Sequence, residues 1–194
     1  MSLRTLAAIL ALALVGSTCG RAEKGEVRVA APTRYGFGRP ATAAEVRAWD
    51  IDVMPDGTGL PPGSGAASQG AAIYARKCAA CHGKTGTEGP FDRLVGREPR
   101  ERFPFGRDPR LVKTIGNYWP YATTLYDYIN RAMPLDAPGS LKPNEVYSLV
   151  AFLLSRNEII ADTAVMNAAT LPRVVMPAHD RFVTDTRRGG PEIR

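Results

Sequence analysis

Residues 77–86 read KCAACHGKTG, and within them Cys78, Cys81 and His82 form the pattern C-x-x-C-H. Two thiols and an imidazole so close together could bind a metal ion, form a disulfide or attach a haem. The spacing is typical of covalent c-type haem attachment. Two intervening residues let one helical turn present both sulfurs to one edge of the macrocycle. The histidine that follows then reaches the iron as proximal ligand.

Three other uses of the motif agree less well with the rest of the chain. A structural zinc ion needs four ligands, but His179 is the only other histidine and there is no second C-x-x-C. A thioredoxin-like redox pair needs a strand before the motif, whereas the preceding residues have a helical pattern. A plain disulfide or two unmodified core cysteines are the last alternatives, although disulfide-stabilised secreted proteins usually carry more cysteines.

A haem with one histidine ligand takes a sixth ligand or leaves the site open. In electron-transfer haems this ligand is usually methionine, whose thioether favours Fe(II) and raises the reduction potential. Met133 is the best-placed candidate, because it ends a predicted helix just before the last one and Pro134 stiffens its loop. Met166 also follows the motif. Met176, which is also followed by proline, stays an alternative, as does a site that is open or ligated by His179.

Other side chains are candidates for the haem environment. A proximal histidine usually donates its second ring N–H to a nearby acceptor, and we expect a backbone carbonyl near Gly89 and Pro90 to accept it. Tyrosine and tryptophan donate hydrogen bonds from an apolar body, which suits the haem propionates. The candidates for the propionates are Tyr118, Trp119, Tyr121 and Arg131.

The N-terminus has the three-part form of a secretory signal peptide, with Arg4, an apolar run at residues 6–15 and small residues up to Ala22. The run is shorter than the about 20 residues that a membrane-spanning helix needs. We therefore expect residues 1–22 to be removed after Ala22 and the mature protein to be periplasmic. A retained anchor and a lipid on Cys19 are the alternatives.

The charge is mildly basic, at +6 from 25 Lys and Arg against 19 Asp and Glu. No dense basic run is present, so nucleic-acid binding has little support. A preference for docking to an acidic partner surface is compatible with this charge. Beyond the N-terminus no segment is apolar enough to span a membrane, so no integral membrane span is expected.

Two extended arms are expected around a haem domain at residues 67–157. Residues 23–66 are rich in Gly and Pro, which favour turns. Within them, one short helix is expected at residues 42–49, with Thr42 as N-cap of a capping box. Residues 158–194 show no clear periodicity and predict a second arm over the core, ending in a polar tail.

Three helices are expected in the haem domain. The first begins at Ser68 and runs into the motif, and its Gly70 marks either a close approach of another helix or a tolerated surface glycine. Residues 83–113 predict a long irregular loop, which a compact domain accepts if it wraps a large cofactor. Helices follow at residues 123–132 and 142–156. The predicted apolar stripe of the middle helix consists of Leu125, Tyr128, Ile129 and Ala132.

Residues 68–157 resemble a class I cytochrome c, with an N-terminal helix, C-A-A-C-H, a Gly-Pro loop, RAMP and a C-terminal helix. Four stretches together resemble, more narrowly, the SoxD-type cytochrome of bacterial sulfur oxidation. They are residues 41–65 (ATAAEVRAWDIDVMPDGTGLPPGSG), 69–83 (QGAAIYARKCAACHG), 113–134 (KTIGNYWPYATTLYDYINRAMP) and 144–154 (NEVYSLVAFLL).

The resemblance implies an all-α class I cytochrome c fold, with N- and C-terminal helices packed around covalently bound haem c and with extended arms. It implies a molybdenum-containing, sulfite-oxidase-like partner that oxidises a sulfur substrate, and a downstream cytochrome c that receives the electrons. Larger members carry a second haem domain, but one C-x-x-C-H predicts one haem here. The chain shows no catalytic constellation of its own. The alternatives are a stand-alone carrier for another dehydrogenase or oxidase, and a sensor or haem enzyme with open iron.

Overall fold

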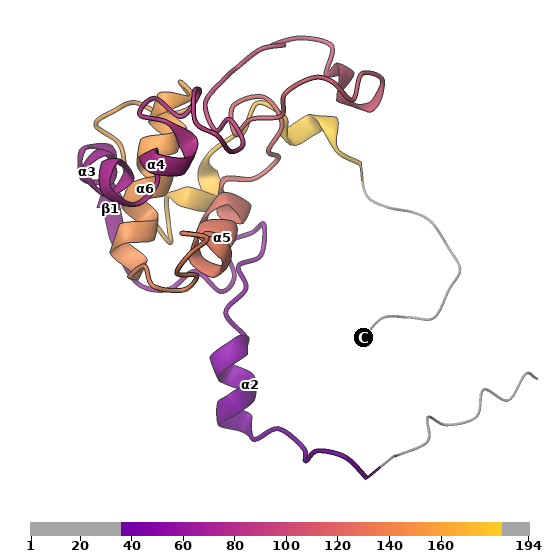
Figure 1. Cartoon of the computed structure of the whole chain (residues 1–194), viewed down its shortest axis with the longest axis vertical. Helices are drawn as coiled ribbons and strands as arrows, with labels where there is room; N and C mark the ends of the chain where they lie inside the picture. Colours follow the sequence, from indigo (N-terminus) through magenta and orange to yellow (C-terminus); the bar gives the residue numbers. More distant parts are fainter. Residues whose placement is uncertain (1–35, 184–194) are drawn as a thin grey trace, which may run out of the picture. The chain divides into compact units, whose positions relative to one another are not determined.

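The computed structural model describes residues 36–183, so the predicted signal peptide at residues 1–22, Cys19 and the end of the tail lie outside the described residues. The chain divides into two compact units, Met1–Ala41 and Thr42–Arg194. The helices and strands of the second unit are, in chain order, α2 (Ala43–Trp49), β1 (Ser64–Ala66), α3 (Ala67–Lys77), α4 (Ala79–His82), η1 (Pro104–Gly106), α5 (Ala122–Ala132), α6 (Pro143–Arg156), β2 (Val165–Asn167), η2 (Leu171–Arg173) and η3 (His179–Arg181) (Figure 1). Among the described residues, no helix is both long and apolar enough to cross a membrane.

Helices α3 and α6 cross in direct contact, and Gly70 makes this possible. A Cβ atom at Gly70 would lie 1.9 Å from the carbonyl oxygen of Ser148 and 2.7 Å from the Cβ of Phe152. The contact continues beside the crossing, where the rings of Tyr74 and Phe152 lie 5.1 Å apart. The close-approach interpretation of Gly70 is therefore confirmed, and the surface-glycine alternative is wrong.

Helix α6 forms the centre of the core. Pro143 occupies its first turn, where a missing N–H costs no hydrogen bond, and Glu145 accepts a hydrogen bond from the backbone N–H of Lys142 at 2.9 Å. These signals confirm the predicted helix at residues 142–156. Its fully buried side chains include Val146, Tyr147, Val150 and Leu154. Burying each large apolar side chain contributes roughly 1.5–3 kcal/mol, so this helix carries much of the stabilisation.

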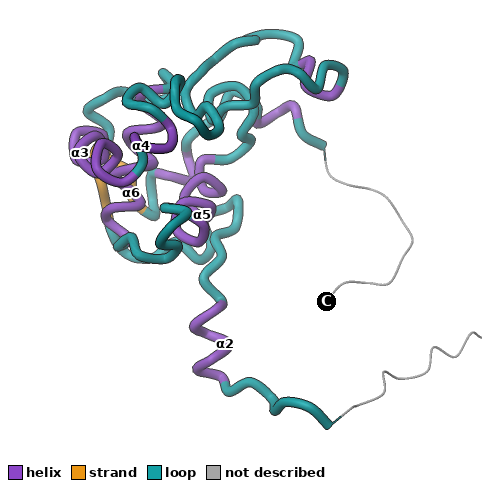
Figure 2. The backbone as a smooth tube through the Cα atoms, in the orientation of Figure 1, coloured by secondary structure: helices purple, strands orange, loops and turns teal. Residues whose placement is uncertain are grey.

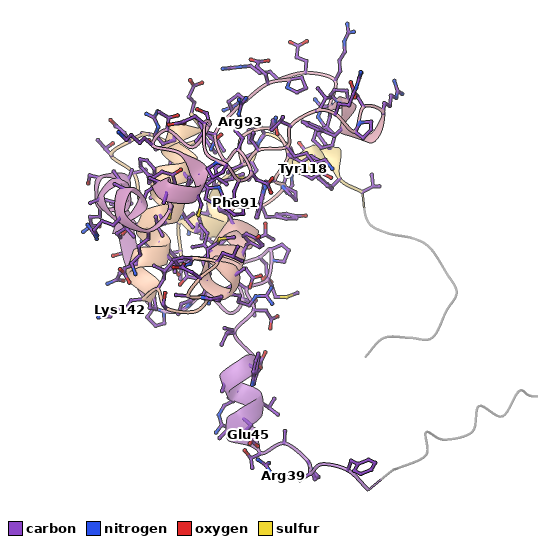
Figure 3. All side chains as sticks on the ribbon, in the orientation of Figure 1. Arg39, Glu45, Phe91, Arg93, Tyr118 and Lys142 are labelled. Carbon is purple, nitrogen blue, oxygen red and sulfur yellow. The ribbon has the colours of Figure 1, made fainter. Side chains whose placement is uncertain are left out.

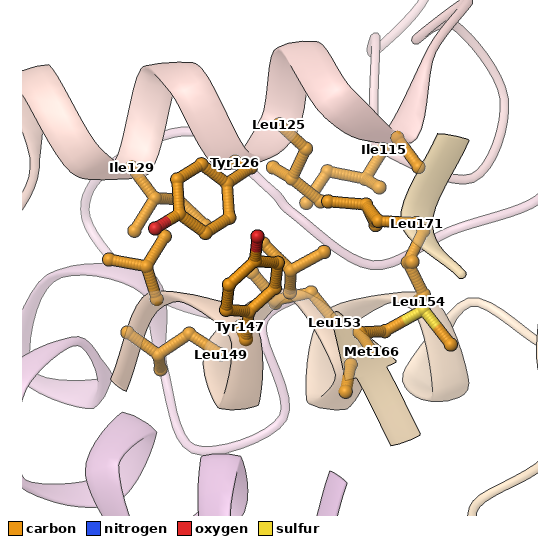
Figure 4. Packing of buried hydrophobic residues seen from close by; sticks show 14 of the residues in the cluster. Ile115, Leu125, Tyr126, Ile129, Tyr147, Leu149, Leu153, Leu154, Met166 and Leu171 are labelled. Atoms are coloured by element: carbon orange, nitrogen blue, oxygen red, sulfur yellow. The ribbon is translucent and has the colours of Figure 1, made fainter. Parts of the chain in front are cut away.

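Helix α5 packs on α6 through a face that differs from the predicted stripe. Leu125 and Ile129 are buried as expected, but Tyr128 is 47% exposed and the prediction for it is wrong. Tyr126 is fully buried instead, with its ring centroid 4.6 Å from that of Tyr147 on α6 (Figure 4). The buried face of α5 thus includes Leu125, Tyr126 and Ile129. Tyr128 lies outside it and packs against Trp119, with ring centroids 5.8 Å apart.

The residues before β1 are tied to α5 and α6 by side chains. The backbone N–H of Val53 donates to the carboxylate of Asp127 at 2.9 Å. The hydroxyl of Thr123 donates to the carbonyl of Pro55 at 3.0 Å. Val53 is buried in the core, so the described part of the N-terminal arm belongs partly to the packed domain. The predicted short helix is confirmed as α2, with its capping box, and none of its residues is buried.

A small antiparallel sheet joins the two arms and was not predicted. Strand β1 pairs with β2 so that Gly65 lies opposite Met166. Both strands pack on α6. Met166, Leu171 and Met176 are buried in the same core cluster as α6. The expected arm after residue 157 therefore does lie over the core, and it contributes side chains to it.

Candidate haem site

The C-x-x-C-H motif lies on a separate helical turn at the end of α3. The predicted single helix is interrupted at Cys78, whose φ of −124° and ψ of −35° end α3 and begin α4. The backbone N–H of Cys78 still donates to Tyr74 at 2.9 Å, and that of His82 donates to Cys78 at 2.9 Å. The turn is thus fixed to α3. Cys78 and Cys81 are both free thiols, so no disulfide joins them in the structure.

The imidazole of His82 is held in one orientation. Its Nδ1 lies 2.8 Å from the carbonyl oxygen of Asp92. With Nδ1 donating, the lone pair of Nε2 is left for a metal, as in proteins where a carbonyl orients a ligating histidine. The acceptor is thus a backbone carbonyl, as predicted, and it belongs to the residue two positions after Pro90. The loop bends so that Gly89 lies against the motif, where a Cβ would be 2.2 Å from the carbonyl oxygen of Cys81.

The described residues around the motif do not supply the ligands that a structural metal ion needs. Burial raises the pKa of the Cys78 thiol to about 11, so the thiol is protonated at neutral pH. Within residues 36–183, no group of three His, Cys, Asp or Glu side chains is placed to hold a metal ion. The described donors at the motif are thus one imidazole and two thiols, without the further ligands of tetrahedral zinc.

Exposed apolar side chains lie close in sequence to both candidate ligand segments. Phe91 is 54% exposed, and its backbone N–H donates to Cys81 at 3.1 Å (Figure 3). Leu135, two positions after Met133, is 66% exposed. Exposed side chains of this size would be stabilised by an apolar partner. Phe91 beside the motif and the oriented imidazole of His82 are compatible with a haem held at the motif.

Met133 differs from the other two methionines after the motif. It is the extended C-cap residue of α5, because a residue before proline disfavours helical geometry, and its side chain is only partly buried. Met166 and Met176 are 5% and 2% exposed and belong to the core cluster. His179 is exposed, and its Nδ1 lies 2.7 Å from a carboxylate oxygen of Asp180.

The other candidate residues are not brought together in one place by described contacts. Tyr118 belongs to a cluster with Phe103, Phe105 and Phe182. Trp119 packs edge-on against Tyr128, with centroids 5.8 Å apart, and Tyr121 packs against His179. Arg131 forms an ion pair with Asp127, which already occupies one side of its guanidinium group. Pro90 is exposed in the loop after the motif.

Glu88 shapes the loop that follows the motif, and sequence reasoning missed it. Its carboxylate accepts hydrogen bonds from the backbone N–H of Thr85 at 3.0 Å and of Thr87 at 3.1 Å, and from both hydroxyls. These bonds lower the pKa of Glu88 to about 2. Gly83, with φ of +80°, allows the Glu88 carboxylate to pack closely against the backbone, because a Cβ at Gly83 would lie 2.6 Å from the Glu88 carboxyl carbon. The T-x-x-E spacing of Thr85 and Glu88 could have predicted these hydrogen bonds from the sequence.

Replacing Glu88 should change the acid stability of the protein. Because the folded-state pKa of Glu88 is lowered, its contribution is complete above the unfolded value near 4.5 and is lost as the pH falls toward about 2. We expect Glu88→Gln to be less stable at pH 7 and to lose less stability than wild type between pH 4.5 and 2. Acid unfolding followed by circular dichroism measures this. Glu101→Gln, at an exposed residue without hydrogen bonds or ion pairs, is the control, and an equal effect there would contradict the prediction.

Two comparisons with known proteins found proteins similar to this chain. The model of the family described as "Cytochrome C oxidase, cbb3-type, subunit III" matches residues 65–153. A chain in the crystal structure of the sulfane dehydrogenase SoxCD from Paracoccus pantotrophus is 40% identical, with a TM-score of 0.68. The match covers 79% of this chain and 74% of that chain. A comparison with curated protein sequences gave no match.

Proposed function

The chain is a class I c-type cytochrome with covalently bound haem, and it belongs to the family of the SoxD-type cytochrome subunit; on this premise we propose that it transfers single electrons from a sulfur-oxidising dehydrogenase to a downstream cytochrome c. The observation that carries the proposal is the oriented His82 next to two free thiols, in a chain 40% identical to one in SoxCD. A bound haem supplies an iron that alternates between Fe(II) and Fe(III).

The residues proposed to hold the haem are those of the motif and one methionine. Cys78 and Cys81 form the thioether bonds, His82 is the proximal ligand and Met133 is the distal ligand. The hydrogen bond from His82 to Asp92 supports the first ligand, because it fixes the ring and leaves Nε2 free. The partly buried position of Met133 supports the second, since Met166 and Met176 are enclosed by core side chains. The single motif supports one haem per chain.

The proposed partner is a molybdenum-containing subunit resembling sulfite oxidase, in the periplasm. The likeness to a chain of SoxCD supports the assignment. The exposed apolar side chains of helix α2 support a docking role for the N-terminal arm, because Trp49 is 86% exposed and Val46 is 54% exposed. Apolar side chains of this size, held on a capped helix with no buried residue, are typical of a surface that another protein covers.

Mass spectrometry of the protein purified from its native source tests the proposal. We expect the mass of residues 23–194 plus one haem, and under native conditions a complex with a molybdenum-containing subunit. A chain without haem, or with two, contradicts the haem assignment. A chain that carries its haem but is isolated alone contradicts the partner assignment and supports a stand-alone carrier. A mass that includes residues 1–22, or a lipid on Cys19, corrects the expected processing.

A further inference from the structure

The loop between α4 and α5 contains a concentration of positive charge. We define the cationic loop as residues 97–113, which carry six Lys or Arg residues against three Asp or Glu residues. This excess of three is half of the formal net charge of +6, although the loop is a small part of the chain. Figure 2 shows that the chain between α4 and α5 is almost entirely without regular structure. An excess of positive charge is thus concentrated on one irregular segment.

The base of the cationic loop is fixed by buried polar side chains. The hydroxyl of Thr114 donates to the carbonyl of Gly96 at 2.5 Å. The amide of Asn117 donates to the carbonyl of Glu98 at 2.6 Å. Thr114 and Asn117 are only 3% and 5% exposed. Buried hydrogen bonds of this kind are costly to break, so the two ends of the loop are held side by side.

The interior of the cationic loop is packed with aromatic rings. Phe103 stacks on Tyr118, with centroids 5.6 Å apart and planes at 14°, and Phe105 is buried at 6% exposure. Arg102 and Phe103 have φ of +67° and +36°, which non-glycine residues adopt only where the surroundings enforce it. The loop is therefore a formed structure with outward-facing arginines, and Figure 3 shows nitrogen-tipped side chains around it.

Part of this charge is not neutralised within the protein. Arg110 forms an ion pair with Asp108 at 2.9 Å, and Arg100 forms ion pairs with Glu98 at 3.1 Å and Glu158 at 3.3 Å. In the described part of the chain, the exposed Arg102 and Arg107 form no ion pair. A guanidinium group binds a carboxylate through two parallel hydrogen bonds, so unpaired exposed arginines attract carboxylates from outside.

A small pocket adjoins the cationic loop and has the same charge. The residues that line it include Arg97, Arg100 and Arg181. Arg97 already donates to the carbonyls of Asn157 and Glu158, at 3.0 and 3.1 Å, which fixes its position. Arg100 is held by the carboxylates of Glu98 and Glu158, whereas the exposed Arg181 forms no ion pair within residues 36–183 and adds to the positive charge beside the loop.

We propose that the cationic loop is a docking surface for an acidic protein partner, and that its unpaired Arg102 and Arg107 bind Asp or Glu side chains of that partner. That this partner is a redox protein rests on the proposed function. That it is acidic is inferred from the positive charge of the loop. Charge attraction over this surface raises the rate of encounter and orients the partner before close contact forms.

Binding of the holoprotein to immobilised poly-L-glutamate tests this proposal with a matched pair of variants. The loop variant is Arg102→Glu with Arg107→Glu. The control variant is Arg76→Glu with Arg173→Glu, at exposed residues outside the loop that form no ion pair. Both variants change the net charge equally. We expect the loop variant to bind at least about tenfold more weakly and the control less than about threefold, with the difference shrinking as salt rises to about 0.15 M.

Two results would overturn the proposal. Equal losses in the two variants would mean that net charge alone governs binding. Loop-dependent binding to phosphatidylglycerol vesicles without loop-dependent binding to poly-L-glutamate would indicate a membrane surface instead of a protein. Circular dichroism and the visible spectrum are recorded on the same samples. An absent haem spectrum contradicts the proposed function, whereas a normal spectrum with equal losses contradicts only the docking surface.

Discussion

Met133→Leu should abolish the weak absorption band that a methionine-ligated ferric haem shows at the red end of the visible spectrum, and it should lower the reduction potential. Leucine conserves most of the side-chain volume but has no thioether to bind the iron. A thioether stabilises Fe(II), so its loss favours Fe(III). We expect a decrease on the order of 0.1 V or more, within the about 0.8 V that axial ligands span. Spectroelectrochemistry of the purified holoprotein measures both effects together.

The other two methionines provide matched controls. Met166 and Met176 are buried in the core cluster, so Met166→Leu and Met176→Leu exchange one core side chain for another of similar volume. We expect each to cost less than about 1.5 kcal/mol of stability and to leave the band and the potential unchanged. A band that survives in Met133→Leu, or disappears in Met176→Leu, would show that the ligand has been assigned to the wrong residue.

Gly70→Ala should destabilise the protein although alanine is the better helix former. The new Cβ would lie 1.9 Å from the carbonyl oxygen of Ser148, which is backbone of α6 and cannot move away alone. Alanine gains about 1 kcal/mol in helix propensity, but separating two packed helices costs more. We expect a net loss of about 1–3 kcal/mol. Urea unfolding of the holoprotein, followed by circular dichroism, measures this loss.

Gly106 provides the matched control for Gly70. Nothing lies within 4 Å of a Cβ built at Gly106, and its φ is not in the left-handed region. Gly106→Ala should therefore change the free energy of unfolding by no more than about 0.5 kcal/mol. If the two substitutions had equal effects, the contact between α3 and α6 would not depend on the missing side chain.

Local signals explain which parts of the fold were predictable. Pro143 at the start of α6, the capping box of Thr42 and the Met133–Pro134 end of α5 act through neighbouring residues, and each element lies where it was expected. The C-x-x-C-H motif is local in the same way. These features depend on a few adjacent side chains and backbone groups, so the sequence contains all the information that they require.

The remaining parts depend on residues that are distant in sequence. Strands β1 and β2 are too short for a periodic pattern, and they pair where both pack on α6. The acceptor for His82 depends on the path of a loop without regular structure, and it is Asp92. The burial of Tyr126 in place of Tyr128 depends on where Tyr147 projects from α6. None of these positions follows from neighbouring residues alone.

The pairing of β1 with β2 has a consequence for shortened chains. Met166 lies opposite Gly65 in the sheet, and β2 is the only strand that pairs with β1 in the described part of the chain. A chain that ended after residue 157 would keep every helix named in the haem domain but would leave β1 as an unprotected edge strand. Open edges pair readily with strands of other molecules. We therefore expect the shortened chain to aggregate more readily than the full chain, an effect that is separate from holding the haem.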